Sequence, residues 1–368
     1  MRRAATLLLA CMIALIMLGL VMLYSTSSVR NAVPFFYLKR QAIWLAIGVI
    51  AGVFVVRIDY HLWQKLSLPM FLFSVVLLAA LFIPNVGIEV NGSTRWIGFG
   101  AFRVQPSELA KFTSVVCMAS WMSVFSRQID DMILGFLIPI AGLGVLGALV
   151  FFEPDFGTST VIIVVGAAIM FAAGAKIWLL LLTCFLGSGA LSVAVYFNKN
   201  RRGRILSFLW PDKYPDQAYH LTQSKIAIIM GGGVGVGLGN SLQKHFYLPE
   251  AHTDFIFSII AEEFGFAGTA IVVCIFLGYF LGGMYISAKA IDPFGRLLGF
   301  GITMMISLQA AFNIGVVTGC LPTKGLALPF ISYGGSSLVM AIVMSAVLLN
   351  IAQHTDPEER IKDRLHRL

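Results

Sequence analysis

The chain has 368 residues, of which 58% are hydrophobic and only 12% are charged, and its formal net charge is +8 at pH 7. Soluble globular domains carry roughly 25% charged residues, so this composition excludes an ordinary water-soluble domain. The apolar residues fall in runs of about 20, which is the length of a helix that crosses a bilayer. Alternation over about ten residues, the pattern of a membrane β-barrel, does not occur. We therefore predict an all-α polytopic membrane protein that forms a single domain over residues 1–368.

Ten apolar runs predict about ten membrane-spanning helices, at residues 6–24, 42–58, 67–84, 107–125, 132–151, 158–174, 177–196, 255–286, 297–318 and 336–352. The eighth run is longer than a bilayer requires, so we expect it to tilt or to begin outside the hydrocarbon. A large extracytoplasmic loop, about residues 198–253, is predicted between the seventh and eighth helices. An even number of spans places both termini on one side, with a short tail at about 353–368.

The distribution of Lys and Arg favours cytoplasmic termini. Long segments cross the membrane largely regardless of their charge, so the seven cations of residues 198–253 do not decide orientation. The remaining cations number twelve on the side of the termini and seven on the opposite side. The outer side is nevertheless basic, which suits an anionic ligand such as a phosphate or pyrophosphate. A solvated surface is the simpler explanation for any single one of these residues.

Two common kinds of site find no support in the sequence. The five cysteines are scattered, four of them within apolar runs, and no Cys or His spacing typical of zinc occurs. The glycine-rich stretch MGGGVGVGLGNS, Met230–Ser241, lacks the GxGxxG and GK[ST] patterns of nucleotide-binding loops. Because glycines this dense permit backbone conformations closed to other residues, we predict a tightly turned or re-entrant segment there.

Two short polar motifs stand at the outer ends of predicted spans. In QPSELAK, Pro106 and Glu108 suit the first turn of a helix. Glu108 and Lys111 also share a helix face, so a role in lining a cavity is an equally good explanation of the motif. In FEPDFGT, residues 152–158, two acidic residues flank Pro154, and a polar turn is the simplest explanation.

A third polar stretch, YLPEAHTDFIFSIIAEEFG, runs from Tyr247 to Gly265 at the start of the eighth span. Asp254 could cap the helix that follows it. Glu262 and Glu263 then lie about 12 Å further along that helix, at about 1.5 Å per residue. This distance exceeds the roughly 5–9.5 Å between the carboxylates of a glycosidase. The alternative is that Asp254 is a single general base for a hydroxyl that attacks an anionic substrate.

Four motifs in order resemble the SEDS family of bacterial membrane proteins that polymerise peptidoglycan. They are RWIGFGAFRVQPSELAKF (95–112), EPDFGTS (153–159), YLPEAHTDFIFSIIAEEFG (247–265) and LPTKGLALPFISYGGSSL (321–338). The similarity covers nearly the whole chain, and NSLQKHFYLPEAHTDFIF is closer to the division branch of the family than to its elongation branch. One position departs from the family, because Tyr219 is followed by His220 where the family usually has Gln. No role of that Gln therefore carries over.

The resemblance implies a glycosyltransferase that polymerises lipid II at the outer face of the bacterial cytoplasmic membrane, at the division septum. Asp254 matches the essential Asp of the family's HTDF motif and would accept the proton of the attacking sugar hydroxyl, in a displacement that inverts the donor. Outer cations would stabilise the pyrophosphate leaving group. We expect substrate contacts from Glu108, Lys111, Arg95, Lys244, Glu250, His252, Gln223, Ser224, Lys324, Ser332 and Ser336, with Arg201 or Arg204 as further cations.

The resemblance also implies partners: lipid II, a class B penicillin-binding transpeptidase, other divisome proteins and the lipid membrane, with no nucleic acid. The sequence requires no cofactor, although a divalent cation, Mg or Mn, could share the neutralisation of the pyrophosphate. Two alternatives would use the same basic outer cavity. One is a flippase that moves lipid II across the bilayer, and the other is a non-catalytic divisome scaffold that recruits a transpeptidase.

Overall fold

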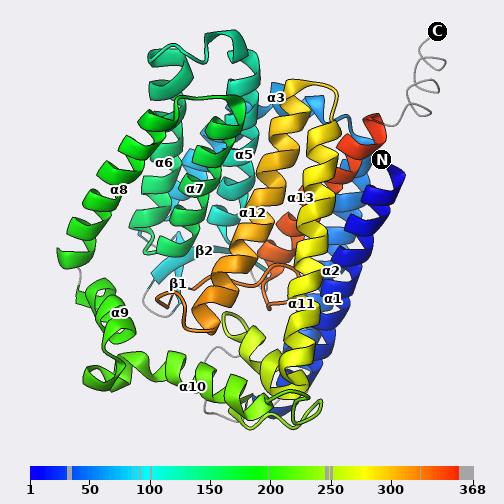
Figure 1. Ribbon diagram of the computed structural model, residues 1–368, viewed down its shortest axis with the longest axis vertical. Coiled ribbons are helices and arrows are strands. Elements are labelled where there is room, and N and C mark those ends of the chain that lie inside the picture. The colour runs from blue at the N-terminus through cyan, green and yellow to red at the C-terminus, as the bar shows by residue number, and fades with distance from the viewer. Residues whose placement is uncertain are drawn as a thin grey trace.

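The computed structural model describes residues 1–30, 35–84, 86–90, 93–99, 102–197, 199–244, 248, 252–323 and 325–355. Long helices form a bundle, in which α1 begins and α13 ends at the same end, and a small sheet and α10 lie at the other end (Figure 1). The helices are α1 (Arg2–Arg30), α2 (Phe36–Arg57), α3 (His61–Lys65), α4 (Ser67–Ala80), α5 (Pro106–Val124), α6 (Ile138–Phe152), α7 (Phe156–Ala173), α8 (Ile177–Phe197), α9 (Lys199–Leu209), α10 (Pro215–Gly231), α11 (Ile256–Lys289), α12 (Pro293–Val317) and α13 (Gly335–His354).

The helical membrane architecture predicted from composition is confirmed. Each of the ten predicted apolar runs falls on a helix, namely α1, α2, α4, α5, α6, α7, α8, α11, α12 or α13. Among the described residues, seven helices are long and apolar enough to cross a membrane, and two shorter apolar helices accompany them at Ser67–Ala80 and Ile177–Gly189. The count of ten spans stays a prediction, because α4 has only 14 residues and a span needs about 20.

A three-stranded antiparallel sheet between α4 and α5 was not predicted. Its strands are β1 (Gly87–Val90), β2 (Ser93–Phe99) and β3 (Phe102–Val104), in the order β1-β2-β3. Ile97 of β2 pairs with Gly87 on one side and with Val104 on the other. The strands are too short to show a periodicity in the sequence, and they form because β-branched and aromatic residues of neighbouring segments pair across turns. The sheet, which includes Arg95, lies toward the end of the bundle opposite the start of α1 and the end of α13 (Figure 1).

The segment predicted as a large outer loop is largely helical. It contains α9, a 3₁₀ turn at Pro211–Lys213, and α10, which runs across the end of the bundle (Figure 1). The buried residues of α10 recur every three or four positions, which is the spacing of one helix face: Ala218, Leu221, Ser224, Ala227 and Gly231. That face packs against α11, so the segment covers the bundle as an additional helical layer.

Helix α11 is interrupted at Gly265, where φ is 64° and ψ is −162°. The interruption would leave backbone groups without helical partners, and the glycine-rich segment supplies them. Main-chain N–H groups of Val236 and Gly237 donate to the carbonyls of Glu262 and Glu263 at 2.9 and 3.0 Å, and the N–H of Phe266 donates to Gly232 at 2.9 Å. The tight turns predicted from the glycine density are present, since Gly232, Gly235, Gly237 and Gly239 all have positive φ.

Candidate active site

Asp254 lies in a turn immediately before α11, and neighbouring elements hold the main chain of that turn. The Asn313 side-chain amide of α12 donates to the carbonyl of Asp254 at 2.8 Å. The Ser332 hydroxyl donates to the carbonyl of Thr253 at 2.6 Å, and the N–H of Tyr333 donates to the carbonyl of His252 at 2.9 Å. These bonds fix the main chain of the turn at the junction of α11, α12 and the segment before α13.

Asp254 is one residue away from the helix-capping position considered as an alternative. Helix α11 begins at Ile256, and Phe255 occupies its N-cap position. The Asp254 side chain is partly exposed, whereas Phe255 and the residues that follow it are buried. The acidic group therefore stands at the surface of the bundle end, next to a buried helix start.

Arg95 of β2 and Asp254 both lie close to Gly325. A Cβ atom on Gly325 would lie 3.1 Å from Oδ2 of Asp254 and 4.0 Å from Nη1 of Arg95. The carboxylate oxygen and the guanidinium nitrogen therefore lie within about 7 Å of each other, the sum of those distances. A side chain at position 325 would crowd both charged groups, and glycine avoids those contacts.

The carbonyls of the EPDFGT turn fix Arg95. Its Nε donates to the carbonyl of Glu153 at 3.2 Å, and its Nη2 donates to the carbonyl of Pro154. In the same turn, Asp155 caps α7 by accepting from the N–H of Thr158 at 3.1 Å and from the Thr158 hydroxyl at 2.9 Å. FEPDFGT therefore forms a polar turn that stabilises the start of α7, in agreement with the simplest explanation of the motif. The same turn also positions the Arg95 cation near Asp254.

Glu153 in this turn is buried without hydrogen-bond partners among the described residues. The residue is 1% exposed, and neither carboxyl oxygen has a partner there. Burial, with a smaller contribution from the charge of Asp155, raises the pKa of Glu153 to about 8, although Arg95 acts in the opposite direction. This carboxyl is accordingly neutral through most of the physiological pH range.

Lys111 and Glu108 of α5 form a buried ion pair. Nζ of Lys111 lies 2.8 Å from Oε2 of Glu108 and donates to Oε1 of Gln309 at 2.7 Å. The Gln309 amide in turn donates to the carbonyl of Ala327 at 2.8 Å. Because Lys111 is only 2% exposed, the pair anchors α12 and the segment at residues 325–334, and a direct contact with substrate would require it to open.

The structure does not bring Lys244 into this cluster. Its Nζ binds Oε1 of Glu263 at 2.9 Å, the Ser25 hydroxyl at 3.0 Å and the carbonyl of Gly239 at 2.6 Å. Lys244 is 3% exposed, so the charge of this predicted outer cation is neutralised by Glu263 inside the protein. Nearby, Glu262 accepts from the N–H of Leu242 at 2.8 Å. Both glutamates of the AEEF motif hold the glycine-rich segment.

The other predicted serines and His252 occupy defined positions. The His252 ring stacks on Tyr37 of α2, with ring centroids 4.2 Å apart. The Ser336 hydroxyl accepts from the N–H of Gln105 at 3.3 Å, which links α13 to the start of α5. Ser224 is fully buried and donates to the carbonyl of Val317 at 2.7 Å, so it ties α10 to α12 and lies away from the surface.

The structure does not test the expected roles of five further predicted residues. Gln223 is half-buried on α10, and Arg204 is exposed on α9. Glu250 and Lys324 lie outside the described residues, as does the side chain of Arg201. Their expected contacts with substrate stay predictions.

Three residues of the site were missed by the sequence analysis: Gln309, Asn313 and Gly325. Gln309 and Asn313 stand four residues apart inside the apolar run of α12, so they share one helix face. Uncharged amides within a membrane segment are expensive unless they are bonded to other protein groups. Two amides on one face of an apolar run were therefore a detectable sign of a buried polar contact. The role of Gly325 had no such signal, because it depends on two side chains that are distant in sequence.

The described residues include no group of three or more His, Cys, Asp or Glu side chains that could hold a metal ion. The cluster instead consists of one accessible carboxylate, one guanidinium and a set of amides and hydroxyls that fix the main chain. This arrangement suits a substrate that brings its own negative charge and a hydroxyl to be deprotonated.

Fold and cluster together define a multi-pass helical membrane protein with an aspartate and an arginine close together at the end of the bundle opposite the start of α1 and the end of α13. The chain belongs to the FtsW/RodA/SpoVE family of cell cycle proteins, whose family model matches residues 5–357. This membership confirms the resemblance seen in the four sequence motifs.

Relatives and solved structures agree with the family. A probable peptidoglycan glycosyltransferase FtsW from Geobacter sp. (strain M18) is 40% identical over 339 residues, which cover 91% of this chain and 92% of the relative. A chain in a structure described as "Structural coordination of polymerization and crosslinking by a peptidoglycan synthase complex" has a TM-score of 0.80 and 25% identity, covering 95% of this chain and 98% of that one. The rod shape determining protein RodA of Thermus thermophilus shares the fold, with a TM-score of 0.72, 24% identity, and coverage of 94% and 96%.

Proposed function

We propose that this protein is a peptidoglycan glycosyltransferase that polymerises lipid II at the outer face of the bacterial cytoplasmic membrane during cell division. The observation that carries the proposal is the clamped turn of Asp254, whose partly exposed side chain lies within about 7 Å of the Arg95 guanidinium. Family relatives such as the Geobacter protein are named probable peptidoglycan glycosyltransferases, and this supports the same reaction here.

Asp254 is the general base of the reaction. Its carboxylate accepts the proton of the 4-hydroxyl of the acceptor sugar, the resulting oxygen attacks C1 of the donor sugar, and the bond from C1 to the pyrophosphate oxygen breaks. One displacement converts an α-linked donor to a β-linked product. General-base catalysis of this kind contributes roughly 10²–10⁴ to the rate.

Arg95 stabilises the charge that develops on the departing pyrophosphate. Two main-chain carbonyls fix its guanidinium, so the cation needs little reorganisation when the charge develops. A divalent cation, Mg or Mn, bound by the pyrophosphate oxygens would share this task, and chelation of the assay mixture tests that part of the proposal. The buried pair of Lys111 and Glu108 supports the site by holding Gln309 and the segment at Ala327.

Both termini lie in the cytoplasm in this proposal, because α1 begins and α13 ends at the opposite end of the bundle from strand β2, which carries Arg95 (Figure 1). The protein works at the division septum with a class B penicillin-binding transpeptidase and other divisome proteins. The similar chain from a structure described as coordinating polymerisation and crosslinking supports a partner of that kind.

Glycan synthesis from purified lipid II tests the proposal. The purified protein, together with its transpeptidase partner, is supplied with lipid II, and the products are separated by length on a gel. We expect polymer from the wild type and none from Asp254→Asn or Asp254→Ala. Asp212→Asn is the matched control, because Asp212 is an exposed carboxylate on the same side of the bundle.

Either of two results would contradict the assignment. Polymer made by folded Asp254→Asn protein would exclude Asp254 as the base. A wild-type complex that binds lipid II but makes no glycan would favour the flippase or the scaffold. Transport of fluorescent lipid II into the opposite leaflet of a vesicle then separates those two alternatives.

A further inference from the structure

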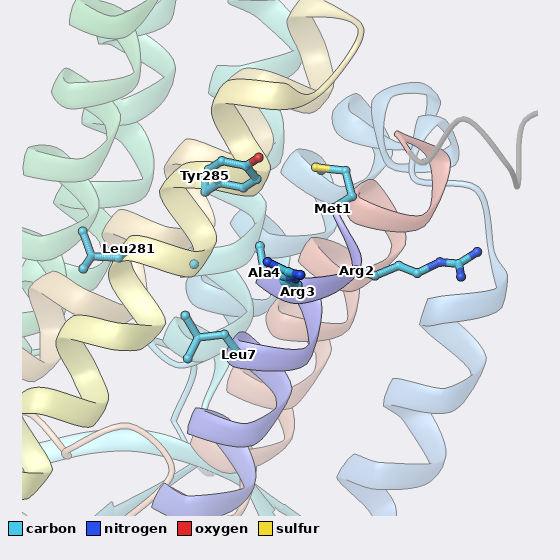
Figure 2. A pocket seen from close by; sticks show the side chains of 8 residues that line it. Met1, Arg2, Arg3, Ala4, Leu7, Leu281 and Tyr285 are labelled. Atoms are coloured by element: carbon cyan, nitrogen blue, oxygen red, sulfur yellow. The ribbon is translucent and has the colours of Figure 1, made fainter.

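A cavity of about 670 Å³ opens between the start of α1 and the end of α11. Arg3, Leu7, Leu281, Gly282 and Tyr285 are among the residues that line it (Figure 2). The helix of α11 continues from its break at Gly265 for 20 residues to Tyr285, which is about 30 Å at about 1.5 Å per residue. The cavity therefore lies at the opposite end of the bundle from Asp254 and has no part in the reaction proposed there.

Polarity changes along the depth of this cavity. Leu7 follows Arg3 by four residues on α1, and Tyr285 follows Leu281 by four residues on α11, so each pair is separated by about 6 Å along its helix. Arg3 and Tyr285 lie nearer the end of the bundle than Leu7 and Leu281, because α1 begins at that end and α11 finishes there. Leu7 and Leu281 lie deeper and are 44% and 55% exposed.

Figure 2 shows how the side chains surround the opening. Leu281 lies on one side, Leu7 lies on the side away from the bundle end, and the Tyr285 hydroxyl is turned toward the start of α1. The Arg2 side chain extends from α1 on the side away from α11. Arg3 is therefore the cation best placed at the opening, and none of the eight described lining residues is acidic.

We propose that this cavity binds one anionic phospholipid of the surrounding bilayer, with its phosphate held by Arg3 and Tyr285 and an acyl chain lying over Leu7, Gly282 and Leu281. The charge is complementary, because a phosphate meets a guanidinium and a phenol where the helices reach the membrane surface. Basic pockets between membrane helices bind anionic headgroups in this way. The exposed side chains of Leu7 and Leu281 favour a lipid over free phosphate as the ligand, since a free ion would leave these apolar side chains uncovered.

Gly282 makes a steric test available. A Cβ atom there would lie 3.5 Å from the carbonyl of Ala4 and 3.8 Å from Cδ2 of Leu7, which are ordinary contacts. Alanine is therefore tolerated at this position, whereas leucine would extend into the space assigned to the acyl chain. The pair Gly282→Ala and Gly282→Leu changes the volume of the cavity without changing its charge.

Native mass spectrometry of the full chain in detergent, with phosphatidylglycerol and phosphatidylcholine added in equal amounts, tests the proposal. We expect the wild type to retain one phosphatidylglycerol in preference to phosphatidylcholine. Loss of one cation near a membrane surface weakens anionic lipid binding about five-fold, so Arg3→Gln should show that reduction and Arg3→Lys should retain most binding. Gly282→Leu should lose the lipid and Gly282→Ala should keep it.

The matched control is Arg127→Gln, an exposed cation that follows α5 at the same end of the bundle but outside the cavity. It should bind phosphatidylglycerol as the wild type does. Equal retention of the two lipids by the wild type, or equal losses in Arg3→Gln and Arg127→Gln, would overturn the proposal. Displacement of the lipid by excess inorganic phosphate would also overturn it, because it would show an ion site without an acyl component.

Discussion

The side-chain amide of Asn313 bonds the main-chain carbonyls of both Asp254 and Leu326, at 2.8 and 2.6 Å. One residue of α12 thus joins the turn that carries the proposed base to the segment that contains Gly325. Because Arg95 and Asp254 both lie close to Gly325, the position of the proposed base relative to its neighbouring cation depends on this amide.

Replacement of Asn313 by Asp should impair turnover. The shape is kept, but an ionised carboxylate has no hydrogen to donate, so two carbonyls lose their donor and face a negative charge. An unsatisfied buried polar group costs about 1–3 kcal/mol, which corresponds to a rate lower by about 10- to 100-fold if the cost falls on the transition state. Glycan synthesis measures the rate, and Asn240→Asp at an exposed position is the control. Normal turnover by Asn313→Asp would show that the clamp does not position the base.

Loss of one partner of the Lys111–Glu108 pair should destabilise the protein more than loss of both. Lys111→Met leaves Glu108 as an uncompensated buried charge, which costs about 3–5 kcal/mol. Glu108→Gln combined with Lys111→Met removes that charge and should recover part of the stability. Thermal unfolding of the single and double variants in detergent measures the difference. A Lys111→Met protein that is fully stable but fails to use lipid II would instead assign Lys111 to substrate binding.

The glycine-rich segment should tolerate a methyl group at one position and not at another. A Cβ on Gly235 would lie 2.2 Å from the carbonyl of Glu263, and its φ of 84° disfavours any other residue. Gly233→Ala is the matched control, because a Cβ there meets nothing within 4 Å. We expect Gly235→Ala to lose several kcal/mol, consistent with overpacking and backbone strain, and Gly233→Ala to change stability little. Equal thermal stabilities would show that α11 does not depend on docking of this segment.

Glu153 should make stability fall as the pH rises. Its pKa in the folded protein is about 8, above the ordinary 4.5, so between those values the folded state binds the proton and the unfolded state does not. The contribution to stability is therefore complete below about pH 4.5 and is lost progressively toward pH 8, with a slope of at most about 1.4 kcal/mol per pH unit.

Glu153→Gln, which cannot ionise, should remove that part of the pH dependence. Thermal unfolding of both proteins from pH 5 to pH 9 measures it, and the variant should gain stability relative to the wild type as the pH rises. Parallel stability curves would show that Glu153 is ionised in the folded protein at neutral pH and has a partner there.

The sequence alone predicted where the helices lie, because each apolar run must satisfy its backbone hydrogen bonds within itself once it is in lipid. It also predicted that Glu108 and Lys111 share one helix face, since this follows from their spacing. The choice of Asp254 as the base came from the resemblance of its motif to the family, because local order alone left helix capping open. The buried face of α10 has a three- and four-residue spacing in the sequence, but the segment was predicted to be a loop. The polar composition of residues 198–253 obscured that spacing.

Contacts between distant segments decided the rest. Lys244 was predicted to be an outer cation, yet it is paired with Glu263 and Ser25. Gly325 matters only because Arg95 and Asp254, which are distant in sequence, both lie close to it. Local sequence determines which residues can be helical or charged at a surface. The partner that each charge finds depends on how the helices pack, because a buried ion must be neutralised by whatever group the tertiary structure places within reach.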